Sequence, residues 1–195
     1  SHSEVSGNGV RGLCALLLRD GPRASLTIDT EGGVKRLEWV AREGARHTFR
    51  AAMGVPEGLR QMTVTAAAEQ IDIAVMMFGN PQCVALGPLP DEARFQRLGP
   101  ALERHEMFPA RTNVEFAHVE SPESVRILIW ERGVGPTTSS GTGSCASLIA
   151  AAAFGGAKRD AEVIAPGGPQ RVEWRDDNVY LTGWAEVVFE GRWLR

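Results

Sequence analysis

The sequence predicts an α+β fold made of two similar halves, each with a mostly antiparallel sheet around one central helix. Two observations lead to this prediction. The motif Ser-Gly-x-Gly occurs at residues 6–9 and again at 140–143, and each copy precedes an apolar run compatible with a helix. The segments between and after the two copies alternate between apolar and polar residues, which is the period of half-buried strands.

The first half is expected to contain one helix and three strands. The helix lies within residues 6–18, SGNGVRGLCALLL, directly after the first glycines. Residues 24–40 alternate around a Glu-Gly-Gly turn and predict a β-hairpin, and residues 47–55 predict a further strand. The stretch 54–61 contains two glycines and a proline, so it is the expected domain boundary.

The second half repeats this arrangement at greater length. Its helices are expected at residues 91–105 and directly after the second Ser-Gly-x-Gly. A Gly-Asn-Pro turn is expected at residues 79–81. Its strands are expected in segments 62–68, 71–78, 112–120, 124–133, 161–168, 170–183 and 185–193.

The composition is that of an ordinary globular protein. Of its 195 residues, 43% are hydrophobic and 23% are charged, enough for one large core or two smaller ones. The net charge of −3 and the scattered basic residues argue against nucleic-acid and membrane-surface partners, and no apolar run is long enough for a membrane-spanning helix. Cys14, Cys83 and Cys145 lack metal-binding spacing and fit reduced thiols in the cytoplasm.

The two Ser-Gly-x-Gly motifs are typical helix starts, and in the second copy Ser140 or Thr142 would be the N-cap. The first N–H groups of a helix have no partner within it and carry a partial positive charge, and glycines let a ligand approach them closely. Two such termini facing each other would bind a small anion from both sides.

Six segments, taken in chain order, resemble motifs of the diaminopimelate epimerase family. They are SHSEVSGNGVRGLCA, GNPQCVALG, TNVEFAHV, VRILIWERGVG, SGTGSCAS and VYLTGWAEVVFEG. The resemblance implies two pseudo-symmetric domains, each a sheet rolled around a helix, with the active site between the helix N-termini. It divides the chain into residues 1–57 with 185–195, and residues 58–184.

The resemblance also implies a reaction that uses neither pyridoxal phosphate nor a metal. In this family one cysteine removes the α-proton of an amino acid and a second cysteine delivers a proton to the opposite face. Here these positions hold Ser6 and Ser140, and the histidine that follows Gly-Asn-Pro is Gln82. A hydroxyl is a far weaker acid than a thiol, whose pKa is about 8.5. Because Gln82 and Pro136 also depart from the family pattern, natural divergence explains the serines better than a deliberate Cys→Ser exchange.

The groups expected to hold the substrate are retained, which makes recognition easier to defend than turnover. The resemblance implies that Arg132 pairs with a distal carboxylate through two parallel hydrogen bonds, and that Glu131 lies beside the catalytic centre. The other implied substrate-binding residues are Gly7, Asn8, Asn80, Asn113, Gly141 and Thr142.

Three functions therefore remain open. The first is an isomerase that interconverts stereoisomers of diaminopimelate, or a related amino acid, in lysine and cell-wall precursor synthesis. The second is a protein that binds a small amino acid or carboxylate without turnover. The third is an isomerase for a more acidic carbon that uses a serine–glutamate pair, indicated by a Glu131 pKa raised by burial.

The chain starts just before the family's first catalytic motif, so the family's N-terminal segment is not in this sequence. We expect either that the chain is a piece of a longer protein or that the missing strands come from another chain, as in a homodimer.

Overall fold

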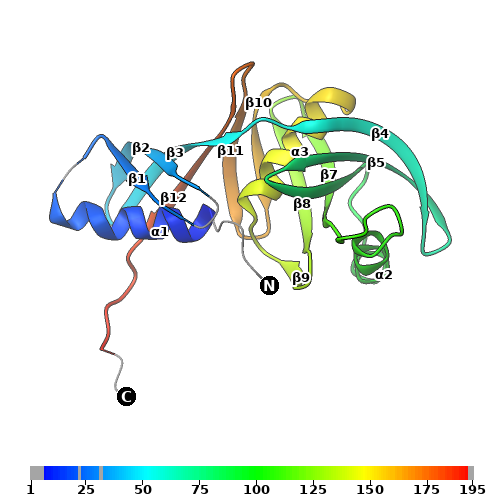
Figure 1. Ribbon diagram of the computed structural model, residues 1–195, viewed down its shortest axis with the longest axis horizontal. Coiled ribbons are helices and arrows are strands. Elements are labelled where there is room, and N and C mark those ends of the chain that lie inside the picture. The colour runs from blue at the N-terminus through cyan, green and yellow to red at the C-terminus, as the bar shows by residue number, and fades with distance from the viewer. Residues whose placement is uncertain (1–6, 22, 31–32, 193–195) are drawn as a thin grey trace.

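The computed structural model describes residues 7–21, 23–30 and 33–192 (Figure 1). The described helices are α1 (Gly7–Leu17), η1 (Leu18–Asp20, a 3₁₀ turn), α2 (Glu92–Glu103) and α3 (Gly141–Phe154). The described strands are β1 (Ser25–Ile28), β2 (Lys35–Glu43), β3 (Arg46–Gly54), β4 (Glu57–Ala66), β5 (Glu69–Phe78), β6 (Asn80–Leu86), β7 (Asn113–Ser121), β8 (Ser124–Glu131), β9 (Gly135–Thr137), β10 (Asp160–Ala165), β11 (Gly168–Trp174) and β12 (Val179–Glu186).

Within this part of the chain the strands form one twelve-stranded sheet in the order β1-β2-β3-β12-β11-β10-β8-β7-β6-β5-β4, with β9 paired to β8. Neighbouring strands run antiparallel except for β6 with β7 and β10 with β8, which are parallel. Figure 1 shows the sheet curling around α1 at one end and around α3 at the other. The predicted α+β fold is confirmed.

Strand β12 joins the two ends of the sheet. It pairs with β3 along Val179–Glu186 and with β11 on its other side. Of the strand predicted at residues 185–193, only Ala185 and Glu186 are in a strand, as the end of β12, because β3 begins at Arg46, the partner of Glu186, and offers no backbone groups beyond it. Residue 193 lies outside the described residues. Residues 187–192 form no regular structure despite their alternating pattern.

Two other sequence predictions need correction. The loop expected at residues 54–61 is shorter, since β3 ends at Gly54 and β4 begins at Glu57. Strand β6 was not predicted beyond its Gly-Asn-Pro start. Residues 82–85 are all buried, so this strand lacks the alternation by which half-buried strands are recognised.

Three apolar clusters lie against the sheet, one around each α-helix. Helix α3 is apolar on all sides, as expected for a helix enclosed by strands. Helix α2 packs on the opposite face of β5–β8, where Phe95 and Leu98 meet Phe116. Helix α1 has its own cluster, in which Cys14 and Leu18 pack with Phe49 of β3. The domain division at residue 57 stays a prediction.

The three cysteines are buried and unpaired, as expected for reduced thiols. Burial raises the pKa of each thiol, so none of them is ionised near neutral pH. None of the helices in the described ranges is long and apolar enough to cross a membrane.

Candidate functional site

Helix α3 begins at the second Ser-Gly-x-Gly motif, and Ser140 is its N-cap. The Ser140 backbone is extended, with φ −141° and ψ 123°, and its Oγ accepts a hydrogen bond of 3.1 Å from the Gly143 amide. The prediction of a cap at Ser140 or Thr142 is thereby confirmed for Ser140. Gly141 is buried, and a Cβ on it would lie 3.1 Å from Leu181 Cδ2.

The start of α1 lies beside the start of α3. Asn8 Nδ2, in the first turn of α1, donates to Ser139 Oγ at 3.4 Å. Arg11, one turn further along α1, is only 5% exposed and donates from Nη2 to Asn8 Oδ1. The first turn of α1 therefore contacts the residue that precedes the N-cap of α3, and the expected roles of Gly7 and Asn8 stay predictions. Ser6 lies outside the described residues.

Arg11 is a buried cation at this junction, and the sequence analysis did not single it out. A Cβ on Gly183 of β12 would lie 3.2 Å from Arg11 Cζ, so glycine is needed where the guanidinium crosses the strand. The Nε of Arg11 has no hydrogen-bond partner within the described residues. Arg11 therefore places a buried positive charge beside Asn8 at the start of α1, where it favours an anionic ligand.

Polar residues of three strands, most of them singled out from the sequence, share one face of the sheet. Val84, Ala117 and Ile129 belong to the cluster around α3. Because successive side chains of a strand point to opposite faces, residues two or four positions away point toward α3 as well. These residues are Asn80 and Gln82 on β6, Asn113 and Glu115 on β7, and Glu131 at the end of β8.

Glu115 is the buried centre of this face. It is fully buried, and a Cβ on Gly143 would lie 2.5 Å from its Oε1, so the carboxyl group occupies the space under the first turn of α3. Burial and the nearby charge of Glu131 raise the pKa of Glu115 to about 8. Glu115, whose carboxyl pKa is raised in this way, was not named by the sequence analysis.

Asn113 holds two backbone segments together. Its Oδ1 accepts a hydrogen bond of 3.0 Å from the Arg132 amide, and its Nδ2 donates to the Pro81 carbonyl at 3.4 Å. The expected role in orienting substrate stays a prediction. What the structure adds is that the Asn113 side chain fixes the backbone on both sides of the site.

A buried carboxylate on α2 fixes the turn that follows β8. Glu103, 2% exposed, accepts hydrogen bonds from Trp130 Nε1 at 3.0 Å and from the Gly133 amide at 2.9 Å. Burial opposes its ionisation, but these hydrogen bonds together with the charges of Arg104 and Arg111 outweigh it and hold the pKa of Glu103 below its ordinary value. Glu103 thereby sets the position of the segment that carries Glu131 and Arg132.

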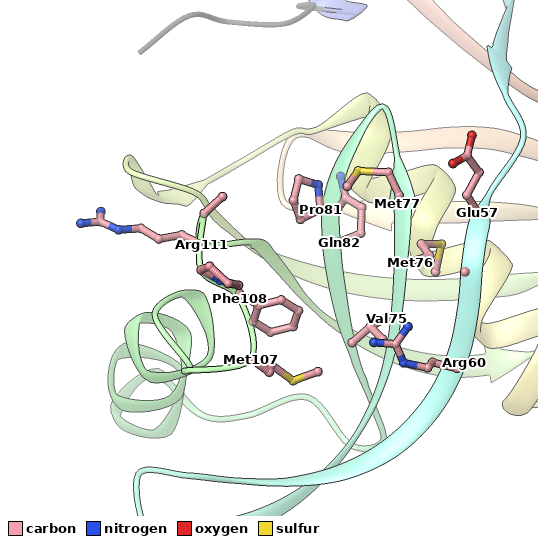
Figure 2. A pocket seen from close by; sticks show the side chains of 13 residues that line it. Glu57, Arg60, Val75, Met76, Met77, Pro81, Gln82, Met107, Phe108 and Arg111 are labelled. Carbon is pink, nitrogen blue, oxygen red and sulfur yellow. The ribbon is translucent and has the colours of Figure 1, made fainter.

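A cavity of about 580 Å³ lies on the α2 side of the sheet, where Val75 and Phe108 of the cluster around α2 line it (Figure 2). Strands β4 to β6 line one side of it, and the segment of residues 107–111 lines the other. Glu57, Arg60 and Arg111 are the charged residues of its wall. The cavity and the polar residues that face α3 therefore lie on opposite sides of these strands.

Two of the residues that the sequence analysis missed are of a type that is unusual for their position in a strand or helix. Glu115 is a charged residue in the middle of a strand in which residues 112–117 are all buried. Glu103 lies in the last turn of α2, where a carboxylate opposes the helix dipole and needs another partner. Both are local conflicts of the kind that a functional or anchoring role explains.

Comparison with known proteins gives consistent similarities. The family model described as "Diaminopimelate epimerase" matches residues 74–188. The chain is 39% identical over 212 residues to the diaminopimelate epimerase of Desulforudis audaxviator, covering 100% of this chain and 76% of that protein. It is 35% identical over 207 residues to that of Desulfitobacterium hafniense, covering 98% and 73%. A solved structure from Pseudomonas aeruginosa, titled a "predicted epimerase", superposes with a TM-score of 0.69 at 16% identity, covering 96% and 76%. That last likeness concerns the fold alone.

Proposed function

Because this chain belongs to the diaminopimelate epimerase family, we propose that it is an isomerase that interconverts stereoisomers of diaminopimelate or of a related amino acid. The pathway would be the synthesis of lysine and peptidoglycan precursors. The observation that supports this most strongly is the meeting of the two helix starts at Asn8 and Ser139. It provides one place where a carboxylate can be held from both sides.

The binding step uses backbone groups and the buried cation. The first N–H groups of α1 and α3, including those of Gly7, Gly141 and Thr142, lack acceptors within their own helices. In the proposed binding mode they donate to one carboxylate. Arg11 adds a positive charge behind Asn8. In this arrangement the donors are already oriented toward the reacting carboxylate. They therefore stabilise the negative charge that develops beside it during the reaction.

The proton-transfer step assigns one serine to each face of the α-carbon, because inversion needs proton departure and arrival on opposite faces. Ser140 acts from the start of α3, where the Gly143 amide already donates to its Oγ and would stabilise an oxyanion. The assignment of Ser6 to the other face rests on the family match. Glu131 lies beside this centre, and Arg132 would hold the distal carboxylate.

The test is hydrogen–deuterium exchange at the α-carbon of LL- and meso-diaminopimelate in deuterated buffer. We expect slow exchange with the natural protein, because hydroxyls replace thiols. We expect the double variant Ser6→Cys/Ser140→Cys to exchange roughly a hundredfold faster, since a group with a pKa nearer neutrality is the better general base. Exchange no faster than in buffer with both proteins would contradict the enzymatic proposal.

The second candidate is a protein that binds the same ligand without turnover. The serine at Ser140 and the amide at Gln82 favour it, since neither group exchanges protons readily near neutral pH. Calorimetry with meso-diaminopimelate separates the two. Heat of binding without exchange supports the second candidate, whereas heat with exchange supports the first. No heat and no rise in melting temperature would contradict both.

A further inference from the structure

The Gln82 amide links Glu115 to Asn80. One polar atom of this amide lies 3.2 Å from Glu115 Oε1 and 3.1 Å from Glu115 Oε2, and its other polar atom contacts Asn80 Oδ1. Gln82 is fully buried, so water does not satisfy either atom. Each contact therefore needs one donor and one acceptor.

Two arrangements meet this requirement, and they differ by one proton. When Glu115 is protonated, its O–H donates to Gln82 Oε1, and Gln82 Nε2 donates to Asn80 Oδ1. The Nδ2 of Asn80 is then left to donate to a ligand.

When Glu115 is ionised, the Gln82 amide turns so that its nitrogen donates to the carboxylate. Its oxygen then faces Asn80, whose amide turns as well and donates to it. The Oδ1 of Asn80 is then left as an acceptor. Asn80 is half-buried, so in both arrangements its outer atom can meet a ligand.

We propose that Glu115 is a positioning residue whose protonation state, relayed through the Gln82 amide, decides whether Asn80 offers a donor or an acceptor to the ligand. This proposal rests on the proposed function in one respect, namely that Asn80 contacts the ligand. The protonated form offers the donor that a substrate carboxylate requires, and it also keeps a negative charge away from that carboxylate.

The groups around Glu115 determine the pH at which its carboxyl group loses the proton. Glu131 on β8 and Cys83 on β6 are the titratable groups coupled to it, and the charge of Glu131 raises its pKa. Residues 140–143 of the α3 start bring no titratable carboxyl, amine or imidazole, although their N–H groups favour an anion. With burial as the largest cause, the pKa of about 8 places the change just above neutral pH.

The first test needs no ligand. We would follow the side-chain amide signals of Gln82 and Asn80 by ¹H–¹⁵N NMR from pH 6 to 10, together with the ¹³C signal of the Glu115 carboxyl. We expect all three to shift with a common midpoint near pH 8. The amide of Asn113, which is bonded to backbone groups, is the internal control and should not follow that midpoint.

The matched variant is Glu115→Gln, which cannot lose a proton, and in it the shifts of Gln82 and Asn80 should disappear. Gln82 and Asn80 signals that stay flat in the natural protein would overturn the proposal, even if the variant does not fold. A titration of these two amides that persists unchanged in Glu115→Gln would overturn it as well.

The second test uses meso-diaminopimelate. We expect its affinity for the natural protein to fall between pH 6.5 and 9 by about tenfold more than its affinity for Glu115→Gln, the size of one hydrogen bond gained or lost. An equal fall in both proteins would overturn the proposal. If meso-diaminopimelate does not bind at any pH, the proposed function fails, and the NMR titration still decides the role of Glu115.

Discussion

Asn8 Nδ2 donates a hydrogen bond to Ser139 Oγ at 3.4 Å, although 131 positions separate the two residues in the sequence. One belongs to the first turn of α1 and the other precedes the N-cap of α3. The contact ties together two helices that belong to different apolar clusters. The geometry of the candidate site therefore depends on how these two parts are held against each other.

We expect Asn8→Ala to lower the free energy of unfolding by about 1–3 kcal/mol, because it removes the acceptor of the buried Arg11 guanidinium as well as the contact with Ser139. Urea unfolding at neutral pH measures the loss. The control is Ser139→Ala, which removes only the long and exposed hydrogen bond and should cost less than about 1 kcal/mol. Equal losses in the two variants would show that Arg11 does not depend on Asn8.

Gly143 is the position at which a single methyl group should disturb the site. In Gly143→Ala the new Cβ would lie 2.5 Å from Glu115 Oε1 and 3.1 Å from Ser140 Cβ. We expect a loss of about 1–3 kcal/mol from this overpacking, with the Glu115 carboxyl displaced. Thermal unfolding measures it.

The matched control is Gly12→Ala, in the interior of α1. A Cβ there meets nothing within 4 Å, so the usual advantage of alanine over glycine in a helix should stabilise the protein by about 0.5–1 kcal/mol. Changes of the same sign in the two variants would contradict the assignment of Gly143 as the glycine that makes room for Glu115.

Much of the fold follows from the sequence, because its main signals are local. The alternation in residues 24–40 and the hydroxyl and glycine residues before α3 predict a hairpin and a capped helix, and both are present. Strand β6 escaped prediction because it is buried on both faces. The segment after Glu186 was overpredicted, because alternation alone cannot say whether a partner strand exists.

The site was predictable only in part, for a similar reason. Ser140, Gly141 and Thr142 sit at a helix start that the sequence itself marks. Glu115, Arg11 and Glu103 act through contacts with residues distant in the chain, such as Gly143, Gly183 and Gly133. No spacing in the sequence encodes such pairs, so only the folded chain identifies them.

Glu103→Gln should weaken the turn that carries Glu131 and Arg132. The amide is a poorer acceptor than the carboxylate for Trp130 Nε1 and the Gly133 N–H, so we expect a loss of about 1–3 kcal/mol at pH 7. Because the pKa of Glu103 is lowered by folding, its contribution is present above its ordinary value of 4.5 and is lost as the pH falls through the folded value. The difference in free energy of unfolding between the natural protein and Glu103→Gln, measured by urea unfolding, should therefore be smaller at pH 4 than at pH 7.

The control is Glu106→Gln, at an exposed position. A loss of stability as large as that of Glu103→Gln would argue against a specific anchoring role of Glu103.

Glu115→Gln should change how stability depends on pH. The pKa of Glu115 is raised from 4.5 to about 8, so between these values the folded protein holds a proton that the unfolded chain has released. The free energy of unfolding of the natural protein should therefore fall as the pH rises through this range, by up to about 1.4 kcal/mol per pH unit from this group. Glu115→Gln lacks this contribution, so relative to the natural protein it should gain stability steadily from pH 5.5 to 8.5 in urea unfolding.

The control for the loss of one carboxylate is Glu162→Gln, at an exposed position on β10. Its free energy of unfolding should depend on pH in the same way as that of the natural protein. Parallel curves for Glu115→Gln as well would mean that Glu115 is ionised throughout and that the site holds a permanent negative charge.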